Sequence, residues 1–150
     1  MRVDHRFDIT ADDATVWRAL ADVAVVISCV PGARVIGRRD DGRYDAAIGI
    51  RYGHIGLEFR GVAAVTYDDG SRVIRIYASG NDRSGATRAA ADLSLDVRPH
   101  DAHLTALRLD GSVDLAGALA HVPAVGADAL VARLMTSFAE RLAARIEGGA

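Results

Sequence analysis

The chain has 150 residues, 50% of them hydrophobic, and a formal net charge of −2. This length suits one domain, and a charge near zero provides no strong field that would steer the chain to nucleic acid. All 18 basic residues are arginine, which excludes Schiff-base chemistry on a lysine and a P-loop. The single cysteine, Cys29, excludes an internal disulfide and a multi-cysteine zinc site.

The first thirty residues predict one strand and two short helices. Residues 2–9 predict a strand with one buried face, because charged residues alternate there with Val3, His5, Phe7 and Ile9. Thr10 or Asp12 can cap a following helix, whose apolar positions are Val16, Trp17 and Leu20. A second short helix over 23–30 should end at Pro31-Gly32, because proline cannot continue the hydrogen-bond ladder of a helix.

Turn signals recur at regular spacing through the middle of the chain. Asp-Gly pairs mark hairpins at 40–42 and 68–70, and polar or glycine-containing segments mark further turns at 53–56, 81–85 and 99–101. Between the turns the side chains alternate with a period of two. We therefore expect about six strands in an antiparallel meander after the two helices.

The period becomes helical near Val122. An amphipathic helix of roughly 22 residues follows, with an apolar stripe that contains Leu130, Leu134, Phe138 and Leu142. One face of the sheet is available to bury this stripe. The predicted fold class is α+β: a curved antiparallel sheet of about seven strands wrapped on a long C-terminal helix, with two short helices after the first strand, in one domain over 1–150.

Short motifs along nearly the whole chain resemble those of one family. In chain order they are Phe7 through Trp17-Arg18-Ala19-Leu20, Asp22 with Cys29-Val30-Pro31-Gly32, Tyr44 with Gly53-His54-Ile55, Phe59-Arg60-Gly61, Gly80 to Gly85, Asp114 to Ala120, and Phe138. Their order and spacing resemble the CoxG-like family, which is named for carbon monoxide dehydrogenase. This family belongs to the START/Bet v 1-like (SRPBCC) superfamily, which has the helix-grip fold. Two positions depart from the family pattern: Cys29 stands where the family has leucine, and His54 where it has proline.

The resemblance implies a cavity between sheet and helix and an accessory role. Such a protein would bind a lipophilic ligand such as a quinone, and would help a molybdenum-dependent carbon monoxide dehydrogenase or related hydroxylase to associate with the membrane. It would require no cofactor, although a quinone or another lipid could be bound. The partners expected are therefore a lipophilic small molecule, the subunits of that enzyme and the membrane surface, but not nucleic acid.

Two groups of residues are the candidate site. Apolar residues expected to line the cavity are Val26, Val30, Ile48, Ile50, Phe59, Ile76, Leu93, Leu134, Met135 and Phe138. Residues expected at its mouth are Pro31, Gly32, Gly53 and His54. Small residues on an inward face leave space that a close-packed interior would fill, and alanines recur within the strands at 46–47, 63–64 and 89–91.

We predict no catalytic and no metal site. Histidines at 100 and 103 lie in an expected solvated turn, and His5 on an apolar strand face. Cys29 follows an apolar segment and is expected to be a buried free thiol. Two alternatives stay open: a cyclase or dehydratase that would use His54 with Tyr44 or Tyr77 inside the cavity, and an adaptor without a ligand.

The expected location is the cytoplasm, with peripheral contact on the inner face of the cell membrane. The N-terminus has no signal-peptide pattern, and no apolar run approaches the roughly 18 residues of a spanning helix. Segments 55–57 and 115–125 could contact a membrane, although internal packing of the second is favoured. Because the domain uses the chain from Arg2 to Ile146, membrane contact would be made by the domain itself or by a tail beyond Gly148-Gly149.

Overall fold

Seven strands and three helices make up the computed structural model, which describes residues 1–52, 55–117 and 124–148. In chain order they are β1 (Arg2–Ile9), α1 (Asp13–Leu20), α2 (Val23–Ser28), β2 (Ala33–Arg38), β3 (Tyr44–Tyr52), β4 (Ile55–Asp68), β5 (Val73–Asp82), β6 (Thr87–Asp101), β7 (Leu104–Gly117) and α3 (Ala124–Gly148).

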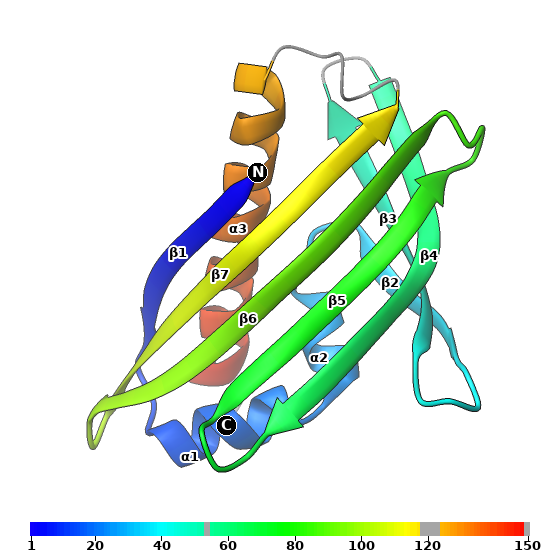
Figure 1. Cartoon of the computed structure of the whole chain (residues 1–150). Helices are drawn as coiled ribbons and strands as arrows, with labels where there is room; N and C mark the ends of the chain where they lie inside the picture. Colours follow the sequence, from blue (N-terminus) through cyan, green and yellow to red (C-terminus); the bar gives the residue numbers. More distant parts are fainter. Residues whose placement is uncertain (53–54, 118–123, 149–150) are drawn as a thin grey trace.

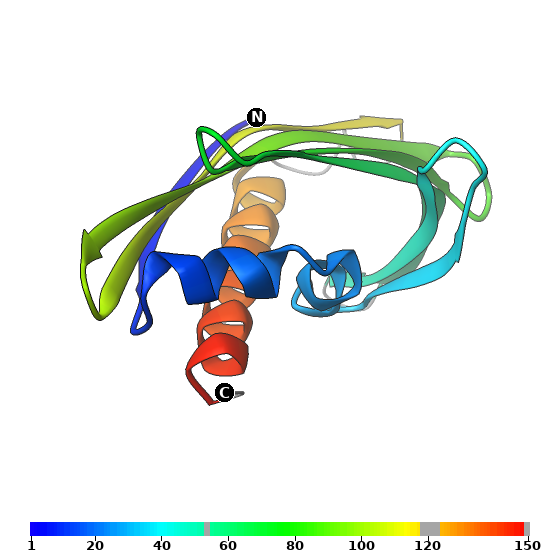
Figure 2. The same cartoon turned by 90° about the horizontal axis from the view of Figure 1, so that it is seen from below.

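The strands form one antiparallel sheet in the order β1-β7-β6-β5-β4-β3-β2. Strands β2 to β7 are a meander, and β1 joins it at the far edge by pairing with β7. The sheet curves around α3, which lies on its concave side, while α1 and α2 lie at one end (Figures 1 and 2). This arrangement confirms the predicted fold class.

Both short helices begin at an aspartate. Asp12 caps α1 by accepting a hydrogen bond from the backbone N–H of Thr15 at 3.3 Å, so the structure selects Asp12 over Thr10. Asp22 caps α2 by accepting from the N–H of Ala24 at 3.0 Å. Helix α2 ends at Ser28, two residues before the predicted end, because the N–H groups after it bond to carbonyl groups three residues back.

Two predicted turns are wrong in their extent. Ile55 and Gly56 belong to β4, where they pair with the end of β3. Pro99 belongs to β6, where a register shift between Pro99 and Asp101 accommodates it. The turn after β6 comes later, and the N–H of His103 donates to a carboxylate oxygen of Asp101 at 2.7 Å.

The main core lies at the α1 end of the molecule. Its fully buried side chains come from every layer of the fold and include Ile9, Leu20, Ile74, Leu95 and Leu142. Two hydrogen bonds fasten the helices to the sheet there: the Tyr67 hydroxyl donates to the Leu20 carbonyl at 2.6 Å, and the Thr105 hydroxyl to the Ala11 carbonyl at 2.7 Å. This end is therefore closed by packed side chains.

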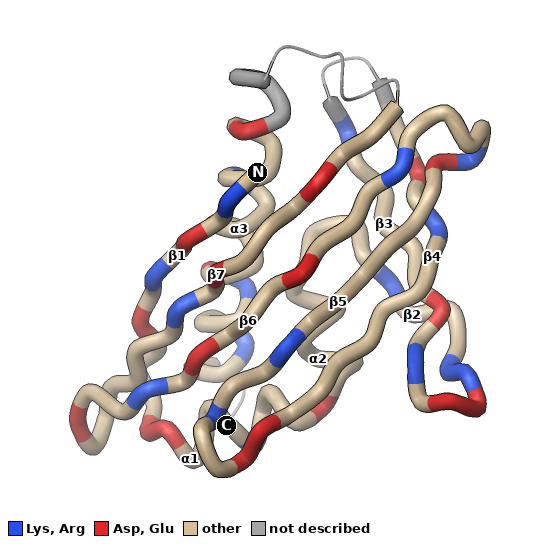
Figure 3. The backbone as a smooth tube through the Cα atoms, in the orientation of Figure 1, with Lys and Arg blue, Asp and Glu red and all other residues tan. Residues whose placement is uncertain are grey.

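Charged residues occupy the outer face of the sheet. Figure 3 shows basic and acidic residues interspersed along the strands. Arg108 reaches from β7 to Asp4 on β1 with two hydrogen bonds of 2.9 and 3.0 Å, and Arg34 reaches from β2 to Glu58 on β4 at 2.6 Å. The alternation thus places the charges outward and leaves the concave face to apolar residues.

Candidate ligand-binding site

The register of the sheet sorts the inward-facing side chains into rows by size. One row near α1 is made of large residues: Tyr67, Ile74, Leu95 and Leu109. The rows farther from α1 are made mostly of small ones. The first consists of Tyr44, Ala63, Ala78, Ala91 and Val113, and the second of Ala46, Gly61, Gly80, Ala89 and Leu115.

Burial falls along the same direction. Ile74 and Leu95 in the large row are 0% exposed, whereas Ala78, Ala91 and Val113 are only half-buried although they face α3 from central strands. Inward-facing residues can be exposed only to a space inside the fold. We call this space, between the small rows and the part of α3 before Phe138, the lumen.

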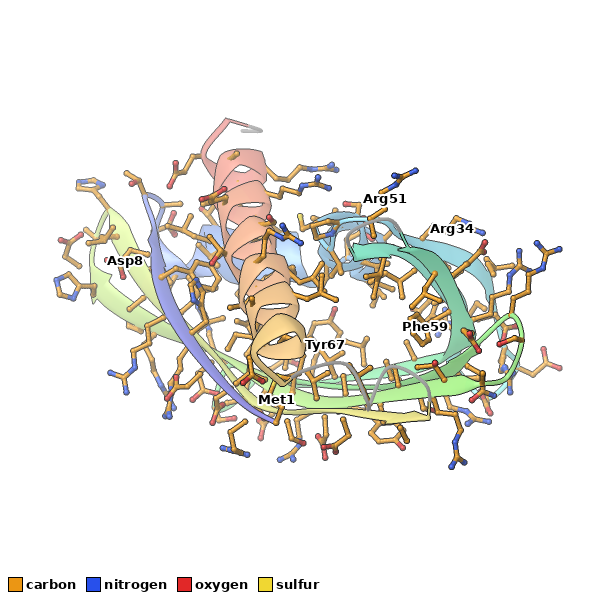
Figure 4. All side chains as sticks on the ribbon, turned by 90° about the horizontal axis from the view of Figure 1, so that it is seen from above. Met1, Asp8, Arg34, Arg51, Phe59 and Tyr67 are labelled. Carbon is orange, nitrogen blue, oxygen red and sulfur yellow. The ribbon has the colours of Figure 1, made fainter. Side chains whose placement is uncertain are left out.

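The side chains that Figure 4 labels show the two faces. Phe59 and Tyr67 point toward the space between the sheet and α3, while Arg34 and Arg51 point away from it. Phe59 is 3% exposed, so it forms a packed wall at the β4 side of this space.

The glycines of the second small row are required by the backbone. A Cβ on Gly61 would lie 1.8 Å from the carbonyl oxygen of Ser79, and one on Gly80 would lie 2.7 Å from that of Arg60. The backbones of β4 and β5 therefore approach too closely for side chains there. The same approach leaves the floor of the lumen without side-chain volume.

A groove of about 270 Å³ opens beside the lumen, between α3 and the end of β3. Its lining consists of Pro31, Gly32, Gly49, Ile50, Arg51, Leu130, Arg133, Leu134 and Ser137, and we call it the α3–β3 groove. It exists because β2 begins opposite Ile48, so the last residues of β3 have no strand on that side. The N–H of Gly49 donates to the Gly32 carbonyl at 3.0 Å and marks where this pairing stops.

A second, larger groove of about 530 Å³ lies between β1 and α3. Its lining includes Val3, His5, Asp128, Val131 and Met135. His5 is half-buried there, and its ring lies 5.9 Å from that of Phe7. This agrees with the predicted place of His5 on the apolar face of the first strand.

The structure brings the predicted lining residues to the concave side of the fold. Val26, Phe59, Leu93 and Phe138 are buried, whereas Val30, Ile48, Ile50, Ile76, Leu134 and Met135 are half-buried. Of the predicted mouth, Pro31 and Gly32 line the α3–β3 groove, and Gly53 and His54 lie outside the described residues. Contact of any of these residues with a ligand stays a prediction.

Sequence reasoning sorted the alanines only in part and missed other site residues. Ala46, Ala63, Ala89 and Ala91 face inward, but Ala47, Ala64 and Ala90 face outward. Ala78 and the two glycines of the small rows were not predicted, although alternation along β5 from Ile76 could have found Ala78. Arg51 and Arg133 in the groove carried no local signal.

One residue of the catalytic alternative is misplaced in that hypothesis. Tyr77 lies opposite Ala64 and Asp92 on the outer face and is 52% exposed, because it is one residue out of phase with the inward-facing Ile76. Tyr44 does face inward, in the first small row. His54 and the segment 118–123, including the predicted membrane-contacting Leu119, lie outside the described residues.

The perturbed groups inside the fold are held in their neutral forms. Burial raises the pKa of Tyr67 to about 12. Burial also raises the pKa of Cys29, and the nearby arginines 141 and 145 oppose this only partly. A protonated, buried thiol is a poor nucleophile. Within the described ranges, no three metal-ligating side chains gather into a cluster, and no helix is long and apolar enough to cross a membrane.

Comparisons with solved structures place the fold. A conserved protein from Geobacillus kaustophilus superimposes with a TM-score of 0.84 at 17% identity, over 99% of this chain and 97% of that one. A START superfamily protein from Mycobacterium smegmatis gives 0.68 at 18%, over 99% of both chains. The Zhui aromatase/cyclase from Streptomyces sp. R1128 gives 0.67 at 18%, over 98% of this chain and 93% of that one.

At such identities these likenesses show the fold alone. The comparison with curated proteins finds no match. A family model does match, and it extends from the middle of β1 to the last turns of α3. It is the model of CoxG, a protein of carbon monoxide dehydrogenase, and it covers residues 6–147, so the chain belongs to the CoxG family.

Proposed function

We propose that this chain binds a lipophilic ligand in the lumen. The supporting observation is the change along the concave face, from fully buried large residues near α1 to half-buried small ones beyond them. Protein interiors are normally close-packed, so a row of half-exposed alanines under a covering helix indicates space for another molecule. The apolar walls suit a ligand with few polar groups.

The proposed ligand class is a quinone or a similar lipid, and the proposed role is accessory. This part rests on membership of the CoxG family, whose name refers to carbon monoxide dehydrogenase. The chain would then help the molybdenum enzyme to associate with the membrane without catalysing a reaction itself. Co-expression with such an enzyme tests this role: the enzyme should sediment with membranes in the presence of this chain and remain in the supernatant without it.

Neighbouring residues on β6 allow a matched test of the lumen. Ala91 faces inward in the first small row, and Ala90 faces outward, opposite Ser79 and Asp114. Ala91→Phe places a ring in the lumen, whereas Ala90→Phe adds the same ring to the outer face. Titration with decylubiquinone, a neutral short-chain quinone, measures the affinity of each variant.

We expect Ala91→Phe to weaken binding at least about ten-fold, because the ring occupies the space of the ligand, and Ala90→Phe to leave it unchanged. Circular dichroism shows whether each variant is folded. A folded Ala91→Phe variant with the original affinity would remove the lumen as the binding site.

A further inference from the structure

The α3–β3 groove combines an apolar wall with a basic rim. Ile50, Leu130 and Leu134 supply the wall, and Arg51 and Arg133 supply the rim. Ile50 also belongs to the concave face of the sheet, one residue pair beyond Ile48 and Phe59. The groove therefore continues the apolar surface of the lumen outward to two guanidinium groups.

These two arginines differ from the arginines around them. Arg34 and Arg60, on the neighbouring outer face, share Glu58 at 2.6 and 3.2 Å. Among the described residues, no carboxylate lies within 4.0 Å of the guanidinium nitrogens of Arg51 or Arg133. Both side chains are exposed, so their positive charge is available to a bound group.

The backbone adds a donor on the same side. The N–H of Gly49 points away from β4, because it donates to the Gly32 carbonyl. Successive N–H groups alternate between the two edges of a strand, so the N–H of Arg51 points to the same edge as that of Gly49. No strand pairs with β3 there, since β2 begins opposite Ile48. An oxyanion in the groove would thus meet a backbone donor as well as guanidinium groups.

We infer that the α3–β3 groove binds an amphiphile with an anionic head group. A carboxylate or phosphate head lies against Arg51 and Arg133, and the alkyl chain crosses Ile50 and Leu134 toward the lumen. Arginine is suited to this role because its planar fork bonds two oxygens of a carboxylate or phosphate at once. The inference rests on the proposed function, because the lumen must accept the chain.

Three probes separate the head group from the chain. Dodecanoate has both, 1-dodecanol has the same chain without the charge, and inorganic phosphate has the charge without the chain. Each is titrated calorimetrically, below the concentration at which the amphiphile forms micelles, into the full chain and into the Arg51→Gln/Arg133→Gln double variant. Arg75→Gln is the matched control, because Arg75 is exposed on the outer face of β5, away from the groove.

We expect dodecanoate to bind at least about ten-fold more tightly than 1-dodecanol, as charge-assisted hydrogen bonds allow, and phosphate alone to bind weakly. The double variant should lose this preference and keep its affinity for 1-dodecanol. Arg75→Gln should change neither, and Arg133→Lys should keep part of the preference because it keeps the charge.

The other outcomes assign failure separately. Equal binding of dodecanoate and 1-dodecanol, unchanged in the double variant, overturns the anionic head group and leaves the lumen proposal standing. Phosphate binding as tight as dodecanoate binding shows an anion site without a chain site and overturns the inference. If neither amphiphile binds to the folded protein, the lumen proposal fails as well.

Discussion

Leu134 and Leu142 lie about two turns apart on α3 but have different surroundings. Leu142 is 0% exposed within the core near α1, whereas Leu134 is half-buried and lines the α3–β3 groove. Leu142→Ala should lower the free energy of unfolding by about 2 to 5 kcal/mol, because it leaves a cavity in close-packed surroundings.

Leu134→Ala should cost only roughly 1 to 1.5 kcal/mol, because its side chain already contacts solvent in the empty protein. Urea unfolding of the two variants measures both values. Equal losses at the two positions would contradict the idea that packing weakens along α3 toward the lumen.

Tyr67 makes stability depend on pH at the alkaline side. Burial raises its pKa to about 12 in the folded protein, from an ordinary value of 10.0, so the fold favours the neutral phenol. The resulting stabilisation is fully present below pH 10 and is lost as the pH rises through about 12. The free energy of unfolding should therefore decline across this range.

Tyr67→Phe separates the two contributions of this side chain. It removes the hydrogen bond to the Leu20 carbonyl, at a cost of about 1 kcal/mol at neutral pH, together with the alkaline decline that Tyr67 causes. Tyr77→Phe, which changes an exposed phenol, is the control and should keep the original pH dependence. Urea unfolding between pH 8 and the highest pH at which the chain stays folded tests this; an identical decline in Tyr67→Phe would contradict it.

At the scale of elements, the turn between α2 and β2 shapes the α3–β3 groove. Gly32 has a φ of +79°, and a Cβ there would lie 2.2 Å from the carbonyl oxygen of Gly49. Gly32→Ala should therefore lower the free energy of unfolding by about 2 kcal/mol or more, through both the left-handed conformation and the clash.

Gly49→Ala is the matched control for this turn. Gly49 lies directly across from Gly32, has no atom within 4 Å of an added Cβ, and has no positive φ. Its substitution should change stability by less than about 1 kcal/mol. Chemical denaturation compares the two variants, and a Gly32→Ala protein as stable as Gly49→Ala would show that the turn relaxes freely.

The elements were predictable where one local pattern decides them. Alternation in β1, β4 and β6 correctly separated buried from exposed residues, because burial of one face imposes a period of two on each strand by itself. Turn lengths were less predictable, because cross-strand pairing extends β4 to Ile55 and β6 beyond Pro99 despite local turn signals.

The site was predictable only in its apolar part. Ile50 and Leu134 follow from face assignment within one strand and one helix. Arg51 and Arg133 are far apart in the sequence, and only the curl of the sheet beside α3 brings them to one groove. The close approach of β4 to β5 at Gly61 also depends on this curvature, so it has no signature within either strand alone.

At the scale of the whole molecule, the fold has a packed end and an open end. The cluster of buried residues joins α1, α3, β1 and the near halves of the central strands. The small rows continue the same strands with few apolar contacts above them. Because the backbone ladder is shared but the packing is not, stability should be divided along the strands rather than between them.

Hydrogen exchange along β6 tests this division, because β5 and β7 flank the strand throughout the compared length. The amides of Leu95 and Val97 lie at the packed end, and those of Ala89 and Ala91 lie at the lumen. We expect the first pair to exchange only through global unfolding and the second pair at least about ten-fold faster, through local opening. Decylubiquinone should slow the second pair to a greater degree than the first, because it replaces the missing apolar contacts. Uniform exchange along β6, with no difference between the two pairs when the quinone is added, would contradict both the packing gradient and the lumen that it creates.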